Sequence, residues 1–141
     1  MARCVLHPLV ATFTVEGLPH ALVAARLSAE YGIGVRPGCF CAHPYLMRLL
    51  GLTDNEVAEF RNEVRRGDRT RTPGAVRASA GINTTEAEIH RLLYAVARIA
   101  GGAKAPVAYV QDPKTGDFIP DLEFARWHAA PQFRGSSCLP G

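Results

Sequence analysis

Lysine is nearly missing from this chain, with Lys104 and Lys114 the only two among 141 residues. The other basic residues are arginines, and 16 Lys+Arg against 13 Asp+Glu leave a formal net charge of only +3. This small excess, with no basic run interleaved with aromatic residues, argues against a nucleic-acid partner. Arginine is suited to rigid, bidentate binding of carboxylate or phosphate groups, so anion recognition stays open.

Long apolar runs are also missing. No apolar stretch in the sequence reaches the length needed to cross a bilayer. The first eight residues lack the apolar segment and cleavage site of a signal peptide. We therefore expect a cytoplasmic protein with no membrane partner.

A disulfide framework is the third absence. The four cysteines are Cys4, Cys39, Cys41 and Cys138, and their spacing fits no such framework. In a reducing compartment, paired thiols are more often reactive or metal-binding than structural. The close pair Cys39 and Cys41 therefore becomes the first candidate for chemistry.

Hydrophobic residues make up 48% of the chain, which is enough for a packed core. Alternating, β-branched segments predict strands over residues 10–16, 33–36 and 75–79. Apolar periodicity predicts helices over residues 18–31, 45–50, 55–66 and 85–100. The first of these helices has its apolar face assigned to Leu18, Leu22, Ala25 and Ala29. Capping boxes are predicted at Thr53 and Thr85.

The alternation of these strands and helices predicts an α+β fold, with a small antiparallel sheet of about three strands covered on one face by helices. We divide the chain into an N-terminal remnant (1–9), a main domain (10–103) and a C-terminal hairpin and tail (104–141). The hairpin is expected to pair residues 107–111 with 117–119 around a Pro-Lys-Thr-Gly turn.

The segment 34–44, GVRPGCFCAHP, places Arg36, Cys39, Cys41 and His43 on one Gly/Pro-rich loop between a strand and a helix. Cys41 is the candidate nucleophile, because a thiol reacts as its thiolate and nearby Arg36 and His43 favour that form. In an extended segment Cys39 lies on the same side as Cys41, where it can act as a helper thiol. The alternative interpretation is that both thiols are small buried core residues.

The same alternation aims Cys39, Cys41 and His43 in one direction, and zinc accepts sulfur and nitrogen ligands. The Cys-x-Cys-x-His spacing is tighter than the usual Cys-x-x-Cys of structural zinc sites, and no fourth ligand is evident. A metal site is therefore the weaker interpretation, and no metal ligand is assigned.

Arg77 lies inside an otherwise apolar strand, where a charge is costly unless it finds a partner. One interpretation is an internal ion pair. The other is an anion clamp, in which Arg77 grips a carboxylate and Arg36, at the end of the neighbouring strand, supplies a second positive group. The pattern alone leaves both open.

Taken together, these segments resemble the C-terminal small domain of the class V aminotransferases, a family that includes the cysteine desulfurases. The matching segments are 13–17 (FTVEG), 33–41 (IGVRPGCFC), 76–82 (VRASAGI) and 84–89 (TTEAEI). The resemblance extends from about residue 10 to residue 100. Two positions depart from the pattern: Asn83-Thr84 replaces a Tyr-Asn pair, and Cys39-Phe40 replaces a histidine pair of many bacterial desulfurases.

The resemblance implies a complete enzyme that uses pyridoxal phosphate, held by a lysine on a separate, larger domain. It implies that Arg77 and Arg36 bind the α-carboxylate of an amino-acid substrate, with L-cysteine the expected one. Cys41 matches the cysteine that accepts sulfur as a persulfide, with Cys39 and His43 as helpers. No cofactor-binding residue is assigned in this chain.

The large domain would precede residue 10, so the chain is expected to be incomplete by itself. We expect no bound cofactor and no turnover of L-cysteine by the chain alone. A large cofactor domain or a homodimer partner is the expected complement. Three alternatives stay open: an interaction module of the same fold without chemistry, an aminotransferase or lyase without sulfur transfer, and a small thiol or metal protein.

Overall fold

The structure, a computed structural model, describes residues 2–7 and 10–121; the tail predicted after residue 121 lies outside them. The strands are β1 (Ala2–His7), β2 (Val10–Val15), β3 (Arg36–Gly38), β4 (Ala75–Ser79), β5 (Tyr109–Gln111) and β6 (Phe118–Pro120). The helices are α1 (His20–Tyr31), α2 (His43–Leu50), α3 (Asp54–Arg65) and α4 (Glu86–Ala100).

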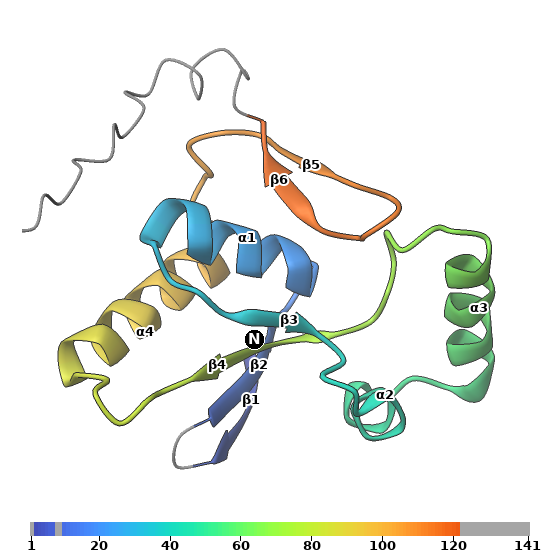
Figure 1. Cartoon of the computed structure of the whole chain (residues 1–141), viewed down its shortest axis with the longest axis horizontal. Coiled ribbons are helices and arrows are strands. Elements are labelled where there is room, and N and C mark those ends of the chain that lie inside the picture. Colours follow the sequence, from blue (N-terminus) through green and yellow to red (C-terminus); the bar gives the residue numbers. More distant parts are fainter. Residues whose placement is uncertain (1, 8–9, 122–141) are drawn as a thin grey trace, which may run out of the picture.

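The main sheet is antiparallel with strand order β1-β2-β4-β3, and β5 and β6 form a separate hairpin. Helices α1 and α4 lie together against one face of the sheet (Figure 1). The predicted α+β class, with a small antiparallel sheet covered on one face by helices, is confirmed. The sequence pattern predicts no strand for residues 2–7, yet β1 pairs with β2 from the Ala2–Val15 pair to the His7–Val10 pair.

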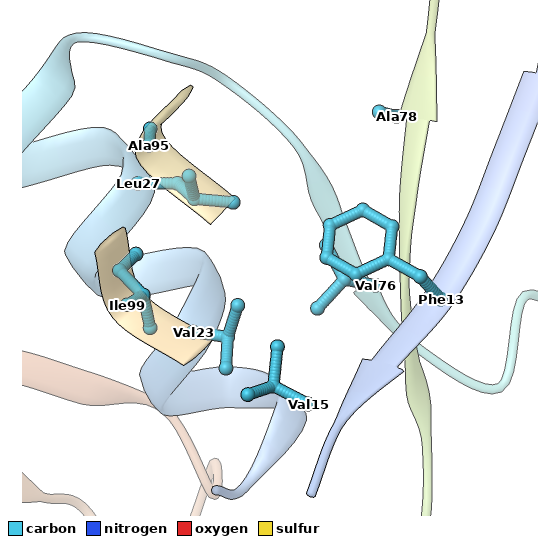
Figure 2. Packing of buried hydrophobic residues seen from close by; sticks show 8 residues of the cluster. All are labelled: Phe13, Val15, Val23, Leu27, Val76, Ala78, Ala95 and Ile99. Atoms are coloured by element: carbon cyan, nitrogen blue, oxygen red, sulfur yellow. The ribbon is translucent and has the colours of Figure 1, made fainter. Parts of the chain in front are cut away.

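The main core lies between this sheet and the two helices (Figure 2). Alternate residues of β2 and β4 point into it and meet α1 and α4. The buried members are Phe13, Val15, Val23, Leu27, Val76, Ala78, Ala95 and Ile99. Because Val76 and Ala78 face the helices, Ala75 and Arg77 face the opposite side of the sheet. The strand alternation of β4 thus separates a packing face from a face that can hold a site.

Of the predicted apolar face of the first helix, only Leu18 packs against the main core, and the assignment of the buried face is wrong. The residues that α1 buries are Ala21, Val23, Ala24, Arg26 and Leu27, whereas Ala29 is exposed. The helix packs against the sheet on one side and contacts β6 on another, so its buried surface is wider than a single stripe. A pattern search for one apolar face cannot detect two contacts at different angles.

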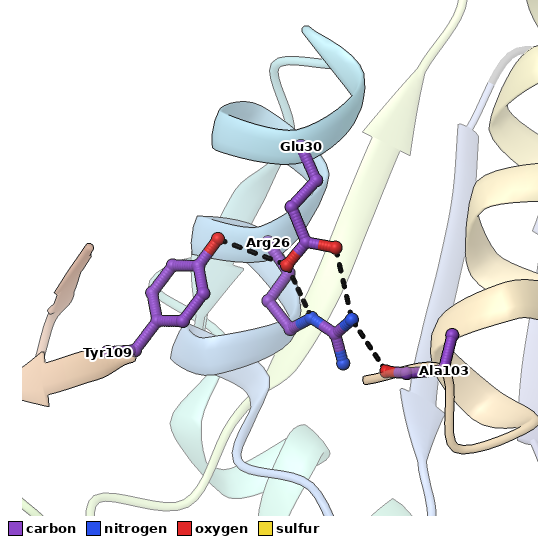
Figure 3. A network of polar contacts seen from close by, with 4 residues as sticks. All are labelled: Arg26, Glu30, Ala103 and Tyr109. Atoms are coloured by element: carbon purple, nitrogen blue, oxygen red, sulfur yellow. Dashed lines mark hydrogen bonds and ion pairs between the residues drawn. The ribbon is translucent and has the colours of Figure 1, made fainter. Parts of the chain in front are cut away.

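A buried ionic network fixes the β5–β6 hairpin and the end of α4 to α1 (Figure 3). The Arg26 guanidinium donates to both carboxylate oxygens of Glu30, at 2.7 and 3.0 Å, and to the carbonyl of Ala103 at 2.9 Å. The Tyr109 hydroxyl donates to Glu30 at 3.1 Å. Burial and the bond to Glu30 raise the pKa of Tyr109 to about 12. The hairpin therefore belongs to the packed body of the protein.

A second, smaller cluster of buried residues packs on the opposite side, from Cys39, Leu46, Met47 and Ala75. It joins β4 to α2. Helix α3, which comes next, buries none of its residues and stands apart from the sheet (Figure 1). Both predicted capping boxes, at Thr53 for α3 and Thr85 for α4, are confirmed. No helix in the described part of the chain is both long and apolar enough to span a membrane.

Candidate functional site

Two arginines face each other across neighbouring strands. Arg36 of β3 is the direct register partner of Arg77 of β4, and Thr12 of β2 lies opposite Arg77 on its other side. Residues directly opposite in an antiparallel pair project to the same face, so the two guanidinium groups share the face away from α1 and α4. Like charges placed directly opposite destabilise a sheet unless something neutralises them. An anion placed between these two arginines would neutralise them, which makes the pair a candidate anion site.

Arg77 is half-buried, and its Nε atom is buried without a hydrogen-bond partner. The guanidinium lies 5.2 Å from the centre of the Phe40 ring, a cation–π contact that holds it in place. No ion pair joins Arg77 or Arg36 to a carboxylate among the residues that the structure describes. The internal ion pair, one of the two interpretations of Arg77, is thus not found there.

The cysteine loop has a tight turn where the sequence pattern predicts an extended segment. Phe40 and Cys41 have left-handed backbone angles, with φ of 53° and 62°. The Ala42 amide donates to the Cys39 carbonyl at 2.9 Å and closes the turn. Left-handed geometry costs a residue with a side chain about 1–2 kcal/mol. The contact of Phe40 with Arg77 and the burial of Cys39 help to hold this conformation.

This turn places the two thiols in different environments, so the prediction that they share one side is wrong. Cys39 is buried and its thiol donates to the Pro73 carbonyl at 2.9 Å. Burial raises the pKa of Cys39, which keeps this thiol protonated. Cys41 is exposed and free. The structure therefore assigns Cys39 to packing and leaves Cys41 as the accessible thiol of the loop.

His43 begins α2 and lies, with Cys39, in the wall of a pocket between α2 and α3. The described residues contain no group of three His, Cys, Asp or Glu side chains placed to hold a metal ion. The metal interpretation requires Cys39, Cys41 and His43 to project to one side of an extended segment. In the described residues the turn at Phe40 and Cys41 breaks this extended segment, so that arrangement is absent.

Two neighbours of Arg77, Phe40 and Thr12, are not among the site residues that the sequence pattern singles out. Thr12 enters only through the β2–β4 register, which no local pattern reveals. Phe40 enters through its contact with Arg77, 37 positions along the chain. The local sequence signal for Phe40 is its position between the two cysteines of the loop.

No part of the described chain fits a cofactor held through a lysine beside this site. Lys104 follows α4, and Lys114 lies in the β5–β6 turn, where its backbone amide donates to Asp112. Both lysines are exposed, and neither belongs to the strands or the loop that carry Arg36, Arg77 and Cys41.

The chain combines a small α+β fold with a strand-borne arginine pair and an exposed loop thiol. The chain belongs to the class-V aminotransferase family, because the sequence model of that family matches residues 6–92. Comparison with curated protein sequences and with solved structures gave no significant match.

Complete enzymes of this family use pyridoxal phosphate as their cofactor. The matched residues include β2, β3, β4 and the cysteine loop, so the arginine pair and Cys41 lie inside the family region. The match ends within α4, before the β5–β6 hairpin. The family match therefore covers the sheet strands that carry the arginine pair and leaves the β5–β6 hairpin outside it.

Proposed function

We propose that this chain supplies the substrate-binding half of a pyridoxal-phosphate enzyme that moves sulfur from L-cysteine. The observation that supports it is the cross-strand pair of Arg36 and Arg77, with the buried Nε of Arg77 left without a partner. An α-carboxylate placed between two guanidinium groups would accept charge-assisted hydrogen bonds, each contributing about 1.5–3 kcal/mol. It would also remove the repulsion between the two arginines.

Cys41 is proposed to accept the sulfur. Its thiol is exposed, and it directly follows Phe40, whose ring contacts the proposed carboxylate-binding Arg77. In the net transfer, the carbon–sulfur bond of L-cysteine breaks and a sulfur–sulfur bond forms at Cys41. Alanine leaves, and a proton replaces sulfur on its β-carbon, so no external oxidant is needed. In this scheme Cys39 is a packing residue rather than a relay.

The cofactor lysine is proposed to come from another polypeptide segment, either a large domain of the same enzyme or a partner subunit. A groove of about 680 Å³ between α4, the segment 33–35 and the ends of β2 and β4 supports this proposal. Its apolar lining includes Val35, Ile89, Leu92 and Leu93, and Leu93 is 59% exposed. An open apolar surface of this kind is typical of a face that packs against another domain.

The test of carboxylate binding uses the chain alone. L-cysteine and L-alanine should shift the amide NMR signals of β3, β4 and the cysteine loop. Cysteamine, which lacks the carboxylate, should not. Arg77→Met should weaken binding about tenfold or more, because it removes one charge-assisted contact. Arg98→Met, an exposed arginine on α4, is the matched control. Equal binding of cysteamine would refute the clamp.

The test of sulfur transfer adds a pyridoxal-phosphate-loaded large domain of a class V enzyme and sulfur-labelled L-cysteine. Label should appear on Cys41, be lost in Cys41→Ala and persist in Cys39→Ala. The second candidate function, transamination or lyase chemistry, needs no cysteine. Keto acid or sulfide production that is unchanged in Cys41→Ala would favour it. Binding of L-cysteine with neither product would favour an interaction module.

A further inference from the structure

A pocket of about 540 Å³ lies between α2, α3 and the segment 69–73, which we name the α2–α3 pocket. It lies on the part of the molecule where α3 stands apart from the sheet (Figure 1). Its volume is within the range of about 300–1,000 Å³ typical of small-molecule sites. None of the residues that make up the arginine pair lines it.

The floor of the α2–α3 pocket is apolar. Val57, Phe60 and Val64 recur at the helical spacing along one face of α3, and Met47 comes from α2. Val57 packs on the smaller buried cluster, whereas Phe60 and Val64 do not belong to it. Helix α3 is amphipathic and buries no residue, so its apolar side chains are accessible to a ligand in the pocket.

The rim of the pocket is cationic. Arg61 and Arg65 lie on the same face of α3 as Val64, one turn apart, while Arg48 comes from α2 and Arg69 from the following loop. None of the four has an ion pair among the residues described. The lining contains one acidic residue, Asp54.

One neighbouring carboxylate is already paired. Glu63 of α3 forms an ion pair with Arg71 at 2.9 Å, and Arg71 lies 5.5 Å from the centre of the Phe60 ring. The other carboxylates that follow Asp54 in α3, Glu56 and Glu59, do not line the pocket, and the rim arginines are exposed to solvent.

We propose that the α2–α3 pocket binds a small amphiphilic anion, with an apolar body against Phe60 and Val64 and a carboxylate or phosphate group on Arg61 and Arg65. The lining has four arginines without an ion pair among the described residues and one carboxylate, which selects an anion, and bidentate guanidinium geometry suits both headgroups. The pocket volume fits a small molecule. The proposal does not depend on the sulfur-transfer function, because neither Cys41 nor Arg77 takes part.

Amide NMR of the whole chain tests the proposal with octanoate, octyl phosphate and octyltrimethylammonium, which share one chain and differ in headgroup. We expect the two anions to shift signals of α2 and α3, and the cation to leave them unchanged. Equal effects of anion and cation would overturn it, and so would shifts confined to the α4 groove. Binding of a hexaglutamate peptide with no effect of either octyl anion would also overturn it and indicate a protein partner.

Two variants separate charge from shape. The double change Arg61→Glu and Arg65→Glu should weaken binding of both anions about tenfold or more. Val64→Trp fills the pocket without changing its charge and should abolish binding. Because α3 buries no residue, both variants should keep the wild-type circular dichroism. The charge-matched control Arg98→Glu on α4 should bind as the wild type does. Unchanged binding in Val64→Trp would contradict the assignment.

Discussion

At the scale of single residues, the site depends on a contact between distant parts of the chain. Phe40 adopts a left-handed backbone and lies on Arg77, while Arg36 opposes Arg77 from the next strand. The arginines and the loop thiol could be found from the sequence, because a charge inside an apolar strand and a Gly/Pro loop with two cysteines are local signals. The difference in burial between Cys39 and Cys41 could not be found from the sequence, because it depends on the turn and on the hydrogen bond to the Pro73 carbonyl.

The difference in burial between Cys39 and Cys41 predicts that the two thiols react at different rates. Cys41 is exposed, whereas burial raises the pKa of Cys39 and its thiol donates to Pro73. With limiting iodoacetamide at neutral pH, Cys41 should be alkylated at least about tenfold faster than Cys39, because the thiolate is the reacting form. Peptide mass spectrometry after timed quenching measures both rates. In denaturant the two rates should converge; a persistent difference there would assign the effect to local sequence.

His20 predicts a pH dependence of stability. Its Nε2 donates to the Thr72 carbonyl at 3.0 Å, its Nδ1 is buried without a partner, and burial lowers its pKa below 6.5 despite opposing effects of Thr72 and Asp117. Below about pH 7 the unfolded chain takes up the proton first, so the free energy of unfolding should fall as pH drops. The loss should end below the lowered folded pKa, and its slope should not exceed about 1.4 kcal/mol per pH unit.

The measurement for His20 is urea unfolding between pH 5 and pH 8, with His20→Gln compared at each pH. The variant should have a shallower dependence than the wild type, since it lacks the titrating ring. His90→Gln, whose ring is exposed on α4, should follow the wild-type curve. Parallel curves for the wild type and His20→Gln would show that another group controls the acid limb.

At the scale of helices and strands, local chemistry predicted the ends of elements better than their faces. The capping boxes at Thr53 and Thr85 follow from short sequence patterns, and both form as expected. The third predicted strand coincides with β4, Ala75–Ser79. The buried face of α1 did not follow, because the β5–β6 hairpin adds a second contact surface. Strand β1 was missed for a similar reason, since its identity depends on pairing with β2.

The Arg26–Glu30 pair gives a prediction for the element contacts. Both side chains are 8% exposed, and they link α1 to Tyr109 and Ala103. Glu30→Gln should lower the free energy of unfolding by about 3 kcal/mol, because it leaves a buried guanidinium without its counter-charge. Chemical denaturation measures the loss. Glu86→Gln breaks an exposed pair of the same i,i+4 spacing, with His90, and should cost less than about 0.5 kcal/mol. Equal costs would show that burial is not the cause.

At the scale of the whole molecule, the chain has two surfaces that its own core does not use. One is the arginine-lined α2–α3 pocket, and the other is the apolar groove beside α4. The apolar periodicity that predicts a helix over residues 85–100 forms a stripe from Ile89 to Ile99, but only Ala95 and Ile99 of α4 are buried. Ile89 and Leu93 of the same stripe are 38% and 59% exposed. The periodicity thus includes one contact inside this chain and an exposed apolar part that we propose as the contact surface for a large domain.

The last prediction concerns that second contact. If the α4 groove packs on a large cofactor domain, Leu93→Glu should weaken association with the domain about tenfold or more, because it places a charge in an apolar interface. It should change the free energy of unfolding of the chain itself by less than about 0.5 kcal/mol, because Leu93 is exposed. Val110→Glu, at a 58% exposed apolar position in the hairpin, is the matched control and should leave association unchanged. Sedimentation of the mixed domains measures binding, and equal weakening by both variants would place the contact elsewhere. Self-association that Leu93→Glu removes in the absence of the large domain would identify a second copy of the chain as the partner.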